Sequence, residues 1–347
     1  MVNEDEVRGL LASVLRIYSP SGGEGEVADF ILKYLKSHGV DAWLDKAGNV
    51  ISIRGNGDRV LWLHAHMDTV PGFIEVREDG GLVYGRGAVD DKGPLVSMVT
   101  AFLNSNPGIT LVLTLVTREE GDSLGSLTLV NSDLPKPTGI VVGEPTNMHI
   151  AYSYRGSAKV EVKCLGHGGH TAGPGVEDNP ILKVYGALNG IINRLGSGQS
   201  SQSYTVTPTM VHCGDHPGKV PTECSMVINV RIPLNSTCVE LERMLGGMEC
   251  VRVVDCTDPV SVSVNNPVIR ALVRASLRNG IKPTLSRKLG TSDMAVLAKL
   301  TLNMAAYGPG DPTLSHGPVE YININDVALA SRILINAIEE FELIESR

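Results

Sequence analysis

In the first forty residues, apolar side chains recur three and four positions apart, which is the spacing of an amphipathic helix. This pattern predicts helices near residues 7–15 and 27–35, separated by the turn sequence at 19–23. Short apolar runs with the length of buried strands follow at 42–44, 50–53, 60–63, 82–84, 111–116 and 139–142. Because strand, loop and helix patterns alternate up to about Tyr154, we predict an α/β domain with a mixed, mostly parallel sheet between helices.

The pattern changes after Arg155. Residues 157–165 alternate between apolar and polar as a half-exposed strand does, and Asn179 with Pro180 opens a long helix that extends to residue 195. Strands at 204–213, 225–232 and 250–255 and a helix at 239–245 complete the order β-α-β-β-α-β, which is typical of a ferredoxin-like domain. We therefore expect residues 155–265 to form an inserted α+β domain, and residues 1–154 and 266–347 to form the main domain.

The chain of 347 residues is long enough for one or two domains with a sizeable core. Its apolar runs are shorter than a membrane span requires, and residues 1–6 are acidic where a signal peptide would be basic. We therefore expect a cytoplasmic protein. A formal net charge of −8 disfavours nucleic acid and anionic membranes as partners.

Six cysteines are present without a CxxC pair: Cys164, Cys213, Cys224, Cys238, Cys250 and Cys256. None of them lies in an acidic or histidine-bearing motif. We expect them to be buried thiols in a reducing compartment. A structural disulfide is the alternative, since intracellular proteins of some hyperthermophiles contain such bonds.

Acidic and histidine side chains gather where the predicted strands of the first domain end. They are His66 and Asp68, Asp90 and Asp91, Glu119 and Glu120, and Glu144, to which a loop near the C-terminus adds His316. In an open α/β sheet, ligands bind at the carboxyl ends of the strands. Imidazole and carboxylate groups at such ends suit zinc or cobalt. The sequence therefore predicts a metal-dependent hydrolase.

The spacing within two of these pairs predicts separate roles. His66 and Asp68 are two residues apart and face the same side of a strand, so Asp68 can orient an imidazole that binds metal. Of Glu119 and Glu120, one can bind metal while the other exchanges a proton with the substrate. Taken alone, each pair is more commonly a solvated turn, a helix cap or a polar loop. Their coincidence at strand ends and loops of one sheet favours a site.

Three motifs resemble those of the M20 family of metallopeptidases and deacylases, which includes acetylornithine deacetylase and succinyl-diaminopimelate desuccinylase. They are His66-Met67-Asp68, the segment 85–93 with the sequence GRGAVDDKG, and Glu119-Glu120. The resemblance covers nearly the whole chain. It implies a zinc-peptidase-like catalytic domain with an inserted ferredoxin-like domain for dimerisation or as a lid. It also implies two divalent ions per subunit, Zn²⁺ or Co²⁺, and hydrolysis of a linear amide bond.

The resemblance further assigns roles to single residues. One ion would be held by His66, Asp90 and Glu144, and the second by Asp90, Glu120 and His316. Asp90 rather than Asp91 would then be the bridge, and a cis peptide bond would follow it. Asp68 would orient His66, Glu119 would be the general acid and base, and His170 would reach across a homodimer to stabilise the oxyanion. The substrate site would be lined by Asn179, Arg231, Gly290, Thr291 and Ser292, with Arg231 as the carboxylate contact.

Within the family, the chain is similar to short members that act on LysW, a small acidic amino-group carrier protein of lysine and arginine biosynthesis. Those enzymes release lysine or ornithine from its C-terminal γ-glutamyl residue. Residues 64–71, 142–147 and 289–294 carry this likeness. A carrier partner implies a basic surface near the site, for which the candidates are Arg155, Lys159, Lys163, Lys219, Arg287 and Lys288. The alternatives are a small-molecule deacylase for acetylornithine, acetyllysine or succinyl-diaminopimelate, a dipeptidase, and a catalytically silent binding protein.

Overall fold

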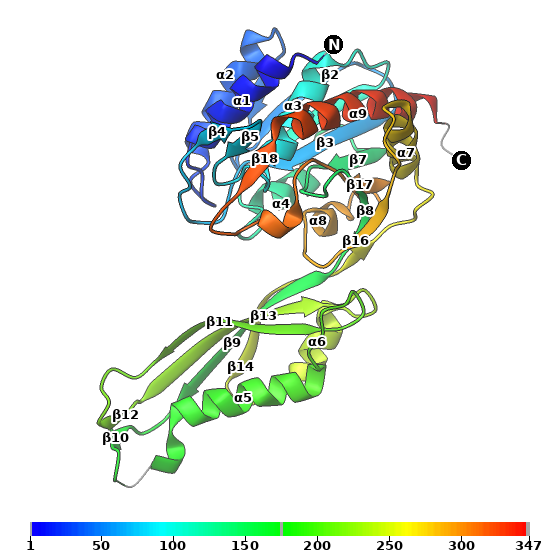
Figure 1. Ribbon diagram of the computed structural model, residues 1–347. Coiled ribbons are helices and arrows are strands. Elements are labelled where there is room, and N and C mark those ends of the chain that lie inside the picture. Colours follow the sequence, from blue (N-terminus) through cyan, green and yellow to red (C-terminus); the bar gives the residue numbers. More distant parts are fainter. Residues whose placement is uncertain (1, 174–175, 345–347) are drawn as a thin grey trace. The chain divides into compact units, whose positions relative to one another are not determined.

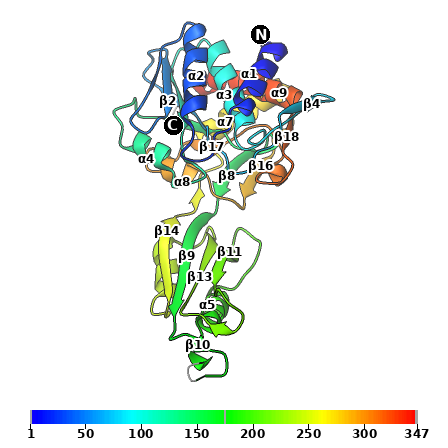
Figure 2. The same cartoon turned by 90° about the vertical axis from the view of Figure 1, so that its left-hand side faces the viewer.

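The structure is a computed structural model that describes residues 2–173 and 176–344. These residues form two compact units. Unit 1 lies within Met1–Tyr152, Val262–Ser286 and Ser292–Arg347, and unit 2 lies within Ser153–Ser261 and Arg287–Thr291. Figure 1 and Figure 2 show that each unit contains a sheet with helices packed against it.

Unit 1 is built on a mixed sheet whose four central strands run parallel. β6 (Thr110–Val116), β3 (Val60–His66), β7 (Gly139–Val142) and β17 (Met304–Ala306) lie side by side in this order. Beside β6, the sheet continues through antiparallel β2 (Val50–Arg54) and β1 (Ala42–Leu44). Beside β17, it continues through antiparallel β8 (Ile150–Tyr154), with β16 (Leu285–Lys288) next to β8. Every residue of β3 and β6 is buried, as in parallel strands that are covered on both faces. The predicted α/β class with a mixed sheet is confirmed.

Helices cover this sheet. The long ones are α1 (Glu4–Arg16), α2 (Gly25–Ser37), α3 (Lys92–Asn104), α7 (Pro267–Arg278) and α9 (Ile324–Leu343), and the short ones are α4 (Leu124–Val130) and α8 (Met294–Leu297). α3 is buried from Lys92 to Phe102 and packs on α1, α9, β3 and β6. A helix that is surrounded in this way needs no polar face. Among the described residues, no helix is long and apolar enough to cross a membrane.

A three-stranded sheet of unit 1 brings two distant loops together. β18 (Tyr321–Asn323) pairs antiparallel with β5 (Leu82–Tyr84), which pairs with β4 (Arg77–Asp79). The loop that leaves β5 contains Asp90 and leads into α3. The loop that enters β18 follows a short 3₁₀ helix, η2 (Pro312–Leu314), and contains His316. The pairing of β5 with β18 therefore places these two loops next to each other.

Unit 2 has the chain order β-α-β-β-α-β. Its sheet contains β11 (Thr205–Cys213), β13 (Glu223–Ile232), β9 (Gly156–Leu165) and β14 (Val251–Thr257), in this order and all antiparallel. α5 (Pro180–Leu195) and α6 (Cys238–Leu245) pack against this sheet. The remaining elements are the short strands β10 (Gly169–His170), β12 (Lys219–Val220) and β15 (Val260–Ser261) and the 3₁₀ helix η1 (Val176–Asp178). Alternate residues of β9, such as Val160 and Val162, are buried, so the sheet has one apolar face.

All six cysteines lie in unit 2, and four of them form disulfide bonds. Cys213 and Cys224 face each other across β11 and β13, with Cα atoms 4.4 Å apart. Cys238 at the start of α6 is bonded to Cys256 of β14, with Cα atoms 5.9 Å apart. The two free thiols are those of Cys164 and Cys250. The expectation of six free thiols is therefore wrong, because disulfide pairing depends on strand register and on the fold, which the cysteine spacing does not reveal.

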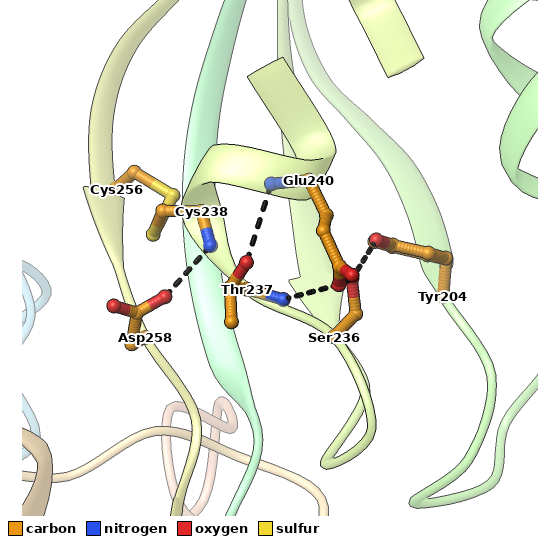
Figure 3. The surroundings of a disulfide bond; sticks show 7 residues. All are labelled: Tyr204, Ser236, Thr237, Cys238, Glu240, Cys256 and Asp258. Carbon is orange, nitrogen blue, oxygen red and sulfur yellow. Dashed lines mark hydrogen bonds between the residues drawn. A yellow bond between two sulfur atoms is a disulfide. The ribbon is translucent and has the colours of Figure 1, made fainter. Parts of the chain in front are cut away.

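The start of α6 is held by capping interactions around the second disulfide (Figure 3). The hydroxyl of Thr237 accepts a hydrogen bond from the amide of Glu240 at 3.2 Å, and the Glu240 carboxylate accepts one from the amide of Thr237 at 3.1 Å. This reciprocal pair is a capping box. The Asp258 carboxylate accepts a further hydrogen bond from the amide of Cys238 at 2.7 Å. These contacts place Cys238 firmly beside β14.

Candidate metal centre

Three adjacent parallel strands of unit 1 end at one edge of the sheet. β3 pairs with β6 on one side and with β7 on the other, so the carboxyl ends of all three strands meet there. His66 is the last residue of β3, Glu119 and Glu120 follow β6, and Glu144 follows β7. The structure therefore gathers these predicted residues at the edge where ligands bind in open α/β sheets.

Asp90 lies between two histidines at this edge. Its Oδ1 is 3.2 Å from Nε2 of His66, and its Oδ2 is 3.4 Å from Nε2 of His316. The same His316 nitrogen is 2.6 Å from Oε1 of Glu120. Potential ligand atoms of Asp90, Glu120 and His316 lie within 4.8 Å of one another, and those of His66, Asp90 and Asp91 form a second such group. One carboxylate shared by two groups of ligands suits a pair of ions about 3.5–4 Å apart.

Asp68 orients the site in two ways. Nδ1 of His66 donates to the main-chain carbonyl of Asp68 at 2.9 Å, while the nearest carboxylate oxygen of Asp68 is 3.5 Å away. The Asp68 carboxylate instead accepts hydrogen bonds from the amides of Glu119 (3.0 Å) and Glu120 (3.1 Å) and from the hydroxyl of Ser21 (2.6 Å). With its Nδ1 proton held by this carbonyl, His66 directs Nε2 toward Asp90, and Nε2 can bind metal once it gives up the proton that it shares with that carboxylate. Asp68 thus fixes the imidazole through its backbone and the Glu119-Glu120 turn through its side chain.

Asp91 and Glu144 are both buried beside these groups. Oδ2 of Asp91 accepts a hydrogen bond from the amide of His66 at 3.2 Å, while its Oδ1 has no hydrogen-bond partner among the described residues. The group that contains His66 and Asp90 is completed by Asp91 and does not include Glu144. Glu144 as a ligand therefore stays a prediction. The peptide bond between Asp90 and Asp91 is cis, as the family resemblance implied.

The centre has an excess of negative charge. Burial raises the pKa of Glu144 well above its usual range, and the charges of Glu119 and Asp90 raise it further. Burial also raises the pKa of Glu119 well above normal, although the charge of His66 opposes the shift. At Asp90 the effect of burial is outweighed by hydrogen bonds from His316 and His66, which hold the pKa of Asp90 below its usual value. Carboxyl groups that oppose one another's ionisation favour a bound cation. The imidazole and carboxylate donors suit zinc or cobalt.

The predicted substrate-binding residues fall into two places. In unit 2, Nη1 of Arg231 donates to the hydroxyl of Thr291 at 2.7 Å, and that hydroxyl donates to the carbonyl of Arg155 at 3.2 Å. Asn179 caps α5, because its Oδ1 accepts a hydrogen bond from the amide of Ile181 at 3.0 Å. Ser292 is buried in unit 1, and Gly290 precedes Thr291 in unit 2. The structure thus joins Arg231 to Thr291 and gives Asn179 a local structural contact.

His170 lies in unit 2, on the short strand β10, and its side chain is exposed. Its Nδ1 accepts a hydrogen bond from the amide of Ala172 at 3.1 Å. Because an acceptor nitrogen carries no proton, the neutral ring has its proton on Nε2. His170 is therefore held in the tautomer that can donate a hydrogen bond outward.

Two buried networks in unit 1 were missed by the sequence analysis. Glu320 is 1% exposed and accepts hydrogen bonds from the loop after β5, including one from Arg86. Asp293 accepts a hydrogen bond from the hydroxyl of Ser126 at 2.6 Å and lies 3.1 Å from Nε2 of the buried His64. Arg86 could have been noticed, because it lies within the GRGAVDDKG motif. No local signal marks Glu320, because it is one acidic residue among many until the chain folds.

Four of the six residues expected to form a basic surface for a carrier protein are buried or paired with acids. Arg155 is 5% exposed, and its Nε donates to the carbonyl of Leu289, so this residue is structural and its prediction as a surface residue was wrong. Three exposed lysines are paired with acids: Lys159 with Glu161 at 3.5 Å, Lys163 with Glu223 at 3.0 Å and Lys219 with Asp215 at 3.2 Å. These pairs reduce the net positive charge that the surface offers an acidic partner.

The chain is similar to known proteins along nearly its whole length. Residues 62–340 match peptidase family M20/M25/M40. A Pyrobaculum aerophilum protein provisionally named LysW-lysine/LysW-ornithine hydrolase is 50% identical over 342 residues, which are 99% of each chain. A Sulfurisphaera tokodaii LysW-lysine/LysW-ornithine hydrolase is 32% identical over 340 residues, covering 96% of this chain and 95% of that one. The M20 family metallo-carboxypeptidase Sso-CP2 of Sulfolobus solfataricus has the same fold, with a TM-score of 0.85 at 17% identity over 98% of this chain and 100% of that one.

Proposed function

Since the chain belongs to peptidase family M20/M25/M40, we propose that it is a metal-dependent amide hydrolase that acts on the carrier protein LysW. It releases lysine or ornithine from the C-terminal γ-glutamyl residue of the carrier. The names of relatives that are 50% and 32% identical over nearly the full chain support this substrate. The observation that carries the chemistry is the position of Asp90, which directs one carboxylate oxygen at each of two histidines.

In this proposal, unit 1 is the catalytic unit and holds two divalent ions, Zn²⁺ or Co²⁺. His66, Asp90 and Glu144 would hold one ion, and Asp90, Glu120 and His316 would hold the other. Two ions bound there would polarise a water molecule and the scissile carbonyl. The buried carboxylates supply negative charge to attract the ions, and Asp68 keeps His66 in the tautomer whose Nε2 can bind metal.

Glu119 moves the protons. Its main-chain amide is fixed by Asp68, and burial raises the pKa of its carboxyl group well above the usual range. A carboxylate with a raised pKa is a stronger base than an ordinary one. Glu119 therefore takes the proton of the attacking water and later returns it to the ε-amine of lysine or the δ-amine of ornithine as the amide bond breaks.

Unit 2 supplies the remaining groups and serves as the dimerisation and lid domain. In a homodimer, Nε2–H of His170 of one subunit donates a hydrogen bond to the developing oxyanion in the site of the other subunit. Arg231, held by Thr291, contacts a carboxylate of the substrate through its planar guanidinium. Asn179, Gly290 and Ser292 complete the substrate site. We place this enzyme in the cytoplasm, where the relatives' biosynthetic substrate would be made.

The decisive experiment identifies the amine that the enzyme releases. Purified protein loaded with Zn²⁺ or Co²⁺ is incubated with LysW that carries γ-linked lysine or ornithine, and in parallel with acetylornithine, acetyllysine and succinyl-diaminopimelate. We expect free lysine or ornithine from the carrier and little from the small amides. If a small amide is hydrolysed efficiently and the LysW substrate is not, the substrate is an acylated amino acid and the proposed carrier substrate is wrong.

A further inference from the structure

Glu320 is a buried carboxylate that the proposed mechanism does not use. It immediately precedes β18, and its side chain is surrounded by hydrogen-bond donors. Its Oε1 accepts hydrogen bonds from the amides of Val89 at 2.8 Å and Asp90 at 3.0 Å, and its Oε2 accepts one from the amide of Gly87 at 3.0 Å. Gly87 has a φ of +85°, in the left-handed region that glycine adopts readily. The loop thus forms a nest of amides around an anion that the chain itself provides.

Arg86 connects this carboxylate to the loop that carries His316. Its Nη1 donates to Oε2 of Glu320 at 3.0 Å, and its Nη2 donates to the carbonyl of Gly317 at 3.0 Å. Its Nε donates to the carbonyl of Gly72 at 2.9 Å. Arg86 is only 8% exposed, so these bonds form away from bulk water, where charge-assisted hydrogen bonds are strong. One planar guanidinium therefore ties together three segments of unit 1.

We propose that Arg86 and Glu320 form a clasp that sets the distance between Asp90 and His316 before any ion binds. Glu320 holds the main-chain amide of Asp90 directly, and Arg86 holds the carbonyl of Gly317, the neighbour of His316. The inference rests on the proposed function, in which Asp90 and His316 are metal ligands. Arg86 and Glu320 are positioning residues, because they act on the ions through these ligands.

Glutamine cannot replace Glu320 in this nest. Its carbonyl oxygen can accept two hydrogen bonds, but its amide nitrogen would meet the remaining donors, which are the amide of Gly87 and the guanidinium of Arg86. The substitution would also leave Arg86 charged and buried without its counter-ion. Loss of such an outer partner reduces metal affinity by about 10–100-fold. Because Asp90 serves both ions, Glu320→Gln should weaken both, whereas Arg86→Met should weaken mainly the ion held by His316.

The test measures the affinity of the full-length protein for Zn²⁺ by competition with a chromophoric chelator. Wild type is compared with Glu320→Gln, Arg86→Met and the control Glu342→Gln. Glu342 is a matched control because its carboxylate also accepts a hydrogen bond from a main-chain amide, that of Gly108 at 3.0 Å. Gly108 precedes β6, whereas the candidate ligand Glu120 follows its other end. Circular dichroism and thermal unfolding show whether each variant is folded.

We expect about a tenfold or greater loss of Zn²⁺ affinity in Glu320→Gln and no change in Glu342→Gln. Folded Glu320→Gln and Arg86→Met proteins that bind Zn²⁺ as tightly as wild type would overturn the clasp while the proposed hydrolase stands. If Glu320→Gln does not fold, the affinity of Arg86→Met decides alone. If the wild-type protein binds only one ion, the proposal of two ions per subunit is wrong. The affinities of the variants for that single ion would then still test the clasp. A wild-type protein that binds no ion would overturn both proposals.

Discussion

At the scale of single residues, the centre depends on carboxyl groups that the fold forces close together. Burial raises the pKa of both Glu119 and Glu144, whereas hydrogen bonds from His316 and His66 lower the pKa of Asp90 despite its burial. One cluster of side chains therefore combines a carboxyl group whose pKa is lowered with carboxyl groups whose pKa is raised. This difference allows Asp90 to bind metal and Glu119 to transfer protons.

Glu119→Gln should remove the proton carrier without removing ligands. Glutamine has nearly the same size but cannot accept a proton, so we expect kcat to fall by roughly 10²–10⁴-fold, with unchanged metal content. Turnover assays with metal analysis measure both quantities. Glu78→Gln is the control, because Glu78 is an exposed residue of β4 paired with Arg8 at 3.6 Å. Undiminished turnover in Glu119→Gln would remove Glu119 from the mechanism.

Metal affinity should fall as the pH falls. Hydrogen bonds to Asp90 and Glu120 raise the pKa of His316 to about 10, so its imidazole is protonated in the metal-free protein below that pH. An ion must displace this proton, and affinity should therefore drop by about tenfold per pH unit for each proton released. Chelator competition between about pH 6 and 8 measures the slope. A flat profile would exclude His316 as a ligand.

At the scale of elements, a strand can continue through polar residues where a neighbouring strand provides hydrogen-bond partners for them. The apolar pattern predicted a strand at 60–63, but β3 continues to His66 because it is paired with β6 along its whole length. His64 lies within this extension, and its Nδ1 is 2.9 Å from the hydroxyl of Thr114 on β6. The extension places His66 at the very edge of the sheet. The strand predicted from hydrophobicity ends before the first histidine, because the apolar pattern contains no information about hydrogen-bond partners on another strand.

The disulfides of unit 2 can be counted chemically. Alkylation of the unfolded, non-reduced chain should label two cysteines, Cys164 and Cys250, and alkylation after reduction should label six. Each disulfide closes a short loop and should stabilise unit 2 by about 3 kcal/mol. Reduction should therefore lower the thermal midpoint of unit 2, which calorimetry can follow. Six labelled cysteines without reductant would contradict both pairings.

At the scale of the whole molecule, the proposed chemistry divides between the two units. The candidate ligands and Glu119 belong to unit 1, whereas His170 and Arg231 belong to unit 2. The amide of Ala172 holds His170 in the tautomer that carries its proton on Nε2, so the exposed ring can donate a hydrogen bond. In the proposed mechanism, His170 serves a site outside its own unit. In the proposed homodimer, this site belongs to the other subunit.

Subunit mixing tests this arrangement. Glu119→Gln and His170→Ala should each be nearly inactive alone, because one lacks the base and the other lacks the oxyanion donor. After mixed refolding, half of the dimers are hybrids, and one of their two sites combines an intact Glu119 with an intact His170. Activity should return to about a quarter of wild type. If His170 instead acts within its own subunit, the mixture should be as inactive as its components.

The fold class, the family and the motifs of the candidate centre could all be read from the amino-acid sequence, because apolar periodicity and short motifs are local properties of a chain. It identified His66, Asp90, Glu120 and His316 as candidate ligands, and these residues do lie together. Local information ends there. The cysteine pairs, the main-chain contact of Asp68 to His66 and the burial of Arg155 depend on strand register and tertiary packing.

The groups that surround the candidate ligands become visible in the folded chain alone. Glu320 and Arg86 are remote from each other in sequence, and they meet because β18 pairs with β5. Bringing two distant segments together costs conformational entropy, and packing in the rest of the fold must offset this cost. A hydrogen bond between such segments therefore forms only in the folded chain. Short motifs therefore reveal the candidate ligands, whereas the fold as a whole fixes the groups that hold them in place.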